Sequence, residues 1–128
     1  MTKPAVKITA IIGAIILLAG AVFHLSALLD VKTSLTEVEP AFFKNALGGM
    51  WVMPALHWIF IACLSVGLSW YKSRACAAIL MGFGIWVIVD ALVTYMYVGP
   101  FMGAYMLALA GMLLLSAGLM LRRQMRAI

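Results

Sequence analysis

Residues 75–98, ACAAILMGFGIWVIVDALVTYMYV, decide how this chain folds. Asp90 is the only charged residue in the segment. A membrane-spanning helix needs about 20 predominantly apolar residues, and this segment is longer than that. An ionisable side chain at membrane depth is costly, so it needs a polar partner and is a functional-site hypothesis by default. The segment therefore predicts a spanning helix that carries one polar site.

The composition of the whole chain leads to the same class of protein. Of its 128 residues 66% are hydrophobic and only 10% are charged, and the mean hydropathy is +1.14. A soluble domain has roughly half apolar and about a quarter charged residues. Because a chain of this size cannot bury so much apolar surface in water, we expect a single domain, residues 1–128, in a lipid bilayer.

Three more apolar runs resemble residues 75–98 in length: residues 8–29, 50–71 and 101–121. Trp51 lies near the start of the second run, and Trp70 and Tyr71 lie at its end, as expected for aromatic residues at the two membrane interfaces. We therefore predict an all-α protein, a bundle of four transmembrane helices.

The first connection, residues 30–49, is the only long polar one. Ser34 and Glu37 have the spacing of a capping box, and Gly48-Gly49 can end a helix. Phe42 and Phe43 could enter the headgroup boundary. We expect a short helix here that lies on the membrane surface.

The positions of Lys and Arg predict the orientation. Seven of the nine lie on the side that holds both chain ends and the second connection: Lys3, Lys7, Lys72, Arg74, Arg122, Arg123 and Arg126. The first connection holds Lys32 and Lys44, and the third holds none. The positive-inside rule then places both termini in the cytoplasm and residues 30–49 outside. The net charge of +5 does not indicate nucleic acid, since the basic residues flank apolar runs.

Three ionisable residues on three predicted helices share one depth in the outer half of the membrane. At 1.5 Å of rise per residue, His24, His57 and Asp90 lie roughly 8, 10 and 12 Å below the outer surface. We expect them to line an outward-facing pocket. Neighbouring polar and aromatic residues that we expect in its wall are Trp58, Trp86, Thr94, Tyr97 and Tyr105.

Several interpretations of this constellation remain open. It could be a structural network, because buried polar groups need partners whatever the function. It could be a ligand or proton site in which Asp90 and a histidine exchange protons. Haem b could be held axially by His24 and His57, with Gly20 making room for the porphyrin. Cu(I) could be bound by Met50, Met53 and His57, or zinc by the two histidines and Asp90.

Small residues predict where the helices approach closely. They recur every seven residues in two stripes, Gly13, Gly20 and Ala27 in the first span and Ala104, Gly111 and Gly118 in the fourth. Cys63 and Cys76 form no C-x-x-C motif and are interpreted as small buried hydrophobes. The chain has no G-x-S-x-G, H-E-x-x-H, P-loop or dinucleotide motif, which makes an enzyme the less favoured class.

The layout resembles the small four-helix bacterial inner-membrane proteins of the DoxX-like type and related uncharacterised families. The similarity lies in length, four spans, cytoplasmic termini and a glycine followed by a histidine near the end of the first span, Gly20-Ala21-Val22-Phe23-His24. It implies a bacterial inner-membrane location and no residue roles. Small multidrug transporters share the size and the four spans, but their membrane carboxylate lies in the first helix, whereas Asp90 lies in the third.

The sequence thus favours a small membrane accessory or binding protein. Its pocket would take a lipid, a quinone or a small amphiphile, and a proton-linked version is open. A redox subunit with haem b and a small transporter are the alternatives. A homo-oligomer or a larger membrane complex is compatible with the glycine stripes.

Overall fold

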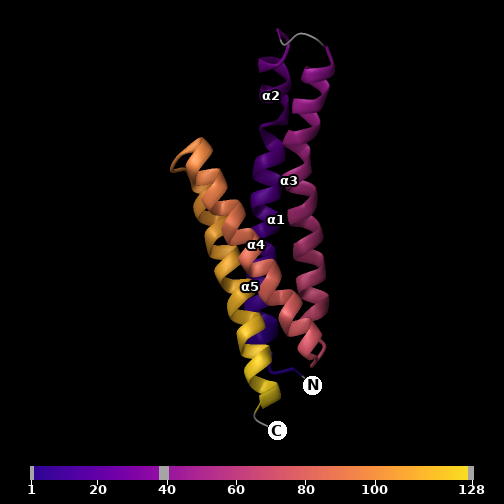
Figure 1. Cartoon of the computed structure of the whole chain (residues 1–128), viewed down its shortest axis with the longest axis vertical. Helices are drawn as coiled ribbons and strands as arrows, with labels where there is room; N and C mark the ends of the chain where they lie inside the picture. Colours follow the sequence, from indigo (N-terminus) through magenta and orange to yellow (C-terminus); the bar gives the residue numbers. More distant parts are fainter. Residues whose placement is uncertain (1, 38–40, 127–128) are drawn as a thin grey trace.

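The computed structural model describes residues 2–37 and 41–126. Its elements are α1 (Pro4–Ser26), α2 (Leu28–Ser34), α3 (Ala41–Leu68), α4 (Arg74–Val98) and α5 (Met102–Arg126) (Figure 1). Within these residues every regular element is a helix. Four stretches there are long and apolar enough to cross a membrane: Pro4–Ser34, Phe42–Leu68, Arg74–Val98 and Met102–Arg126. The fold is therefore the predicted all-α bundle with four membrane-crossing helices.

Local sequence explains several helix ends. α1 begins at Pro4, where a missing N–H costs nothing because the first helical N–H groups have no partner in any case. α4 begins after Ser73, whose hydroxyl oxygen accepts a hydrogen bond of 3.2 Å from the Ala75 amide. α4 ends at Val98, and the next residue, Gly99, has a φ of 95° that favours glycine.

The first connection differs from the prediction in one respect. The short helix is α2, which follows α1 after Ala27, whereas residues 41–49 form the first turns of α3 rather than a separate surface helix. Gly48 and Gly49 do not end this helix, because the apolar pattern continues on both sides and a helical glycine costs only about 1 kcal/mol. Residues 38–40 of the predicted outer loop lie outside the described part of the chain.

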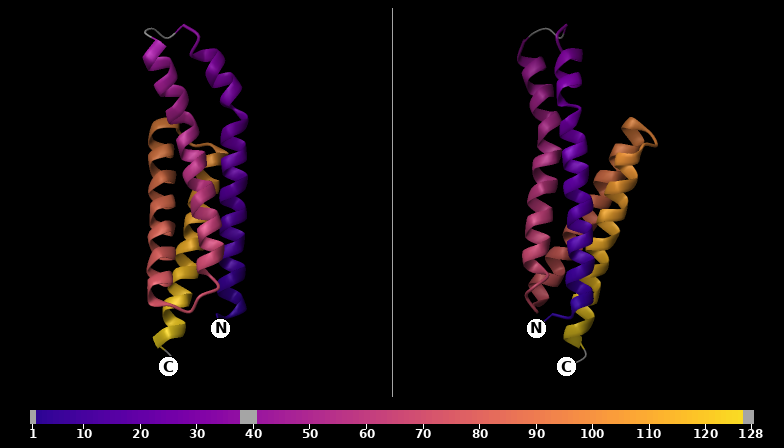
Figure 2. Two further views of the ribbon diagram at one scale, coloured as in Figure 1. Left: turned by 90° about the vertical axis from the view of Figure 1, so that its right-hand side faces the viewer. Right: turned by 180° about the vertical axis from the view of Figure 1, so that it is seen from behind.

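As a result α3 is long, and Pro54 lies in its interior. A proline inside a helix removes one hydrogen bond, which membrane helices tolerate when neighbouring groups supply partners. α3 and the α1–α2 pair extend past the loop between α4 and α5 (Figures 1 and 2). We call the end of the bundle that holds both chain termini the terminus end, and the opposite end the loop end.

The helices pack in the order α4, α5, α1, α3. α5 contacts α4 and α1 extensively, and α1 contacts α3, but α3 and α4 meet only sparsely. The hairpin of α4 and α5 leans away from α1 and α3 towards the loop end (Figure 2). The bundle is therefore closed on three sides and loosely closed between α3 and α4.

The α4–α5 interface depends on glycines. A Cβ added at Gly84 would collide with the backbone of Leu115, and one at Gly118 would lie 2.7 Å from Met81. Gly111 similarly faces Ile88, so the predicted stripe on α5 is confirmed as a packing surface. Of the two glycines of α1, only Gly13 packs closely, since a Cβ added there would lie 3.2 Å from Leu113. A Cβ at Gly20 would meet no atom within 4 Å, so the prediction of a close approach there is wrong.

Two apolar clusters form the core. One includes Leu17, Ile61 and Leu114 in the middle of the bundle, and the other includes Val6, Leu80 and Leu121 at the terminus end. The terminus end is also tied by polar contacts, since the Thr2 hydroxyl donates to the Trp70 carbonyl (2.9 Å). The Lys7 ammonium lies 3.7 Å from the centroid of the Trp70 ring.

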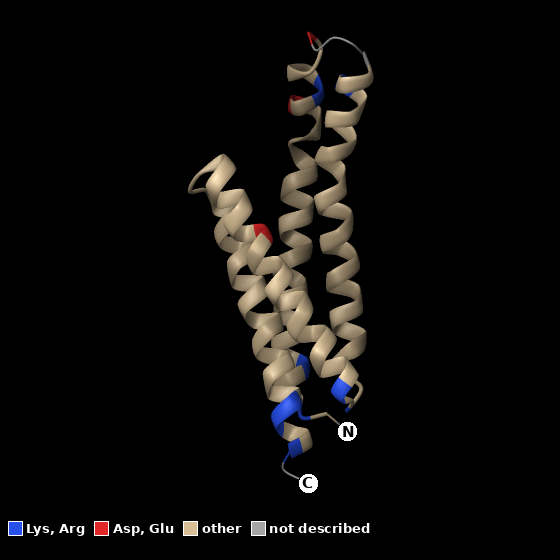
Figure 3. Ribbon diagram, in the orientation of Figure 1, with Lys and Arg blue, Asp and Glu red and all other residues tan. Residues whose placement is uncertain are grey.

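Large apolar side chains also cover the outside of the helices, among them Ile8, Ile15, Phe60 and Met96. Lys and Arg gather at the two ends of the bundle, most of them at the terminus end (Figure 3). A surface that is apolar between two charged ends suits hydrocarbon rather than water.

Candidate functional site

Asp90 on α4 is hydrogen-bonded to two consecutive residues of α3. Its Oδ2 atom lies 2.7 Å from His57 Nε2 and accepts a hydrogen bond of 2.9 Å from Trp58 Nε1. An indole N–H can only donate, so this carboxylate oxygen is the acceptor for Trp58, and an N–H at His57 Nε2 would make a second such bond. These two contacts are the polar bridge across the sparse α3–α4 interface.

Only half of the Asp90 carboxylate is used by the bridge. Within residues 2–37 and 41–126, the Oδ1 atom of Asp90 receives no hydrogen bond. This atom is not fully buried. The side chains of His57 and Asp90 are 36% and 22% exposed. The bridge therefore leaves one carboxylate oxygen both unbonded and accessible from outside the protein.

His24 makes a second polar contact between α1 and α3. Its Nε2 atom lies 2.7 Å from the Trp51 carbonyl oxygen, and Trp51 Nε1 donates to the His24 carbonyl at 3.2 Å. Because a carbonyl can only accept, Nε2 of His24 carries the hydrogen. The two rings are stacked, with centroids 4.3 Å apart. Pro54 lies three residues after Trp51, and its missing N–H removes the helical donor of the Met50 carbonyl rather than that of Trp51.

Trp58 joins the two contacts. The residue is only 6% exposed, and its ring meets the rings of His24 and His57 edge-on, with centroids 5.3 and 5.9 Å away. We call the five residues His24, Trp51, His57, Trp58 and Asp90 the histidine–tryptophan cluster. The cluster brings together side chains from three helices, and its centre is an indole rather than the carboxylate.

The chain matches no protein-family model, no curated protein and no solved structure. An interpretation of the cluster therefore depends on its geometry and chemistry alone.

The predicted wall of the pocket is only partly assembled around the cluster. Trp58 lies at its centre, but the side chains of Trp86, Tyr97 and Tyr105 are 58%, 86% and 56% exposed. Thr94 is half-buried, and among the described residues its hydroxyl makes no hydrogen bond. Trp86, Tyr97 and Tyr105 thus point to the surroundings of the bundle.

Helical geometry explains these outward positions. Val87 and Ala91 define the buried face of α4, and Asp90 lies at its edge. With 100° of rotation per residue, Trp86 and Tyr97 are turned farther from that face than Asp90. Trp86 and Tyr97 lie on the same broad face of α4 as Asp90, but this position was not enough to predict that they contact the cluster.

Trp51 belongs to the cluster, although sequence reasoning had assigned it to a membrane interface. The available signal was its spacing of seven residues from Trp58, which places both rings on one face of α3. The extension of α3 towards the loop end moves Trp51 from the expected start of a span into the helix interior.

The metal and haem alternatives meet an obstacle in the hydrogen bonds. Nε2 of His24 and Nε2 of His57 are both engaged, so axial ligation through them would require both contacts to break. Met50 and Met53 are exposed on the outside of α3. In the described part of the chain no group of three or more His, Cys, Asp or Glu side chains could hold a metal ion. His24 thus does not join His57 and Asp90 in the three-residue zinc site considered above.

Proposed function

We propose that the chain is a small integral membrane protein that binds a lipid, a quinone or another small amphiphile at the histidine–tryptophan cluster. The terminus end would face the cytoplasm of a bacterial inner membrane, because it carries most of the Lys and Arg residues. The cluster would then lie in the outer half of the bilayer. This orientation also fits the layout that resembles the DoxX-like proteins, although no residue role is taken from that resemblance.

The observation that carries the proposal is the accessible Oδ1 atom of Asp90. A carboxylate oxygen in an apolar environment without a partner is costly, so a donor group supplied by a ligand would stabilise it. A ligand with a hydroxyl or ammonium group could donate to Oδ1. The sparse α3–α4 contact provides a route by which such a ligand could enter sideways from the lipid.

The chemistry around Asp90 selects for an amphiphile. The polar groups are few, and Trp58 and the stacked His24–Trp51 pair offer aromatic surface close to them. Quinol hydroxyls and lipid headgroups combine a donor with a large apolar body, as binding sites of this composition require. His57 beside Asp90 could also exchange a proton with a bound ligand.

The proposal can be tested by titrating purified protein in detergent with a short-chain quinone, a phospholipid or a long-chain amine. The exposed Trp70 and Trp86 would first be replaced by Phe, so that Trp51 and Trp58 report binding by fluorescence. We expect a saturable change with at least one ligand class and at least a tenfold weaker affinity in Asp90→Asn. Asp30→Asn, which neutralises an exposed carboxylate on α2, is the matched control. Equal affinity in Asp90→Asn and the control would contradict the proposal.

A further inference from the structure

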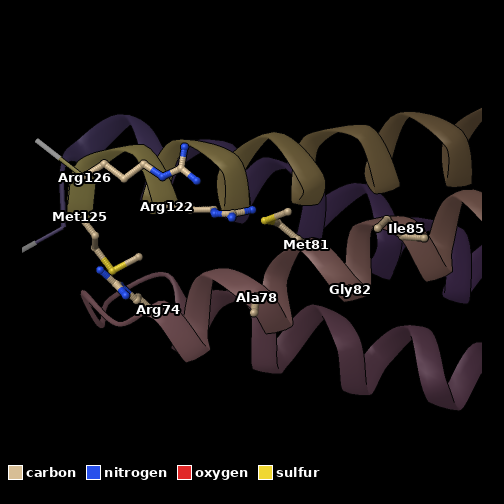
Figure 4. A pocket seen from close by; sticks show the side chains of 8 residues that line it. All are labelled: Arg74, Ala78, Met81, Gly82, Ile85, Arg122, Met125 and Arg126. Atoms are coloured by element: carbon tan, nitrogen blue, oxygen red, sulfur yellow. The ribbon is translucent and has the colours of Figure 1, made fainter.

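A second candidate site lies at the terminus end of the bundle, far along the helices from the histidine–tryptophan cluster. A groove of about 720 Å³ runs between α4 and α5, and three of the residues that line it are Arg74, Arg122 and Arg126 (Figure 4). Arg74 comes from the start of α4 and the other two from the last turns of α5. Arg122 and Arg126 are four residues apart, which places them on one helix face.

Within the part of the chain that the structure describes, no carboxylate balances the charge of this groove. No acidic residue lines it, and none of the three guanidinium groups forms an ion pair with a carboxylate within residues 2–37 and 41–126. Arg122 and Arg126 suit the negative end of the α5 dipole, but Arg74 lies at the positive end of α4, where a cation is unfavourable. An anion between these residues would relieve both the mutual repulsion and this helix-end effect.

Guanidinium groups and the geometry of phosphate are well matched. Each guanidinium presents N–H groups in a planar fork that binds two phosphate oxygens at once. Three such groups around one groove mouth can therefore hold a phosphate diester more strongly than any single arginine.

Beyond the arginines the groove becomes apolar. It continues along α4 past Met81, Gly82 and Ile85 (Figure 4). From Arg74 to Ile85 the helix rises roughly 16 Å, close to the thickness of one leaflet of a hydrocarbon core of about 30 Å. Gly82 leaves the groove floor open, since a Cβ there would meet no atom within 4 Å.

We propose that this groove binds an anionic phospholipid. The phosphate lies among Arg74, Arg122 and Arg126, and one acyl chain lies along α4 towards Ile85. A soluble phosphate would use only the charged mouth, whereas the apolar part of the groove has the length and the position of a lipid chain. Basic pockets between membrane helices at the cytoplasmic interface commonly hold such headgroups. The site is separate from the histidine–tryptophan cluster and does not depend on the function proposed for it.

The test uses the full chain in detergent, with phosphatidylglycerol and phosphatidylcholine as probes and native mass spectrometry as the readout. We expect phosphatidylglycerol to remain bound at least tenfold better than phosphatidylcholine. The double variant Arg122→Gln/Arg126→Gln should lose at least tenfold in that binding. Arg123→Gln, on the same turn but outside the groove lining, should lose less than twofold. Equal losses in Arg123→Gln and in the single variant Arg122→Gln would show general charge attraction and overturn the proposal.

A second variant separates a lipid from a free phosphate. Gly82→Leu fills the apolar part of the groove without changing any charge, and the open space at Gly82 allows the fold to be kept. We expect this variant to weaken phosphatidylglycerol binding at least fivefold, and millimolar inorganic phosphate to displace little lipid from the unaltered chain. Unchanged lipid binding in Gly82→Leu, or full displacement by inorganic phosphate, would contradict the lipid assignment.

Discussion

The two interfaces of α4 are built on different principles. Towards α5, α4 packs backbone against backbone at Gly84, and the fit depends on the absence of side-chain atoms. Towards α3, contacts are few, and the link is the pair of hydrogen bonds from His57 and Trp58 to Asp90. Close packing therefore holds one side of α4, while two hydrogen bonds are the main link on the other side.

The largest loss of stability is expected at the α4–α5 interface, where the contact depends on close packing. In Gly84→Leu the new side chain would collide with the backbone of Leu115, so α4 and α5 must separate. Overpacking of a tight interface typically costs about 1–3 kcal/mol and occasionally more, and a backbone collision belongs to the severe cases. Unfolding by SDS in mixed micelles, followed by circular dichroism, measures the loss. Gly82→Leu on the same helix is the control, and equal stability of the two variants would refute the role assigned to Gly84.

A smaller effect is expected at the polar bridge. Asp90→Leu leaves Trp58 Nε1 and His57 Nε2 without their acceptor, which typically costs about 1–3 kcal/mol. Asp90→Asn should cost less than Asp90→Leu, because the amide oxygen can take the place of Oδ2, which alone accepts both bonds. The same SDS unfolding assay gives both values. If Asp90→Leu is as stable as the unaltered chain, the bridge does not hold α3 to α4.

The smallest effect is expected at Ser65 on α3. Among the described residues, its hydroxyl oxygen is the one fully buried side-chain polar atom that lacks a hydrogen-bond partner. Ser65→Ala removes an unpaired polar group, so stability should stay within about 0.5 kcal/mol of the unaltered chain or rise slightly. The nearby Ser69 is equally buried, but its hydroxyl donates to the Val66 carbonyl at 2.7 Å. Ser69→Ala should therefore be the more destabilising of the two, and the reverse order would contradict this assignment.

The sequence was sufficient for the fold because hydropathy and length decide it. The four apolar runs predicted the four long helices, and the glycines of the fourth run predicted one packing surface. The length of α3 could not be predicted from the sequence. Gly48-Gly49 and Pro54 are helix-breaking signals, yet the helix continues through all three residues. Local helix-breaking signals therefore failed where the apolar pattern continues on both sides of them.

For the site, the sequence predicted only the depth of the ionisable residues along their helices. Matched depth correctly brought His57 and Asp90 together, since it depends on topology alone. The side chains of Trp86 and Tyr97 point outward because small rotations at the edge of a helix face are set by packing. The pairing of His24 with Trp51 depends on the extension of α3 and on the relative placement of α1, neither of which is written in a local motif.

A double-mutant cycle between His57→Phe and Asp90→Leu tests most directly whether a polar bridge joins α3 and α4. Hydrogen bonds between membrane helices have coupling energies of about 0.6 kcal/mol on average and up to about 1.7 kcal/mol. Because His57 Nε2 and Asp90 Oδ2 are only 2.7 Å apart, we predict a coupling of about 1 kcal/mol or more in SDS unfolding. Additive effects of the two substitutions, with no coupling, would contradict the account.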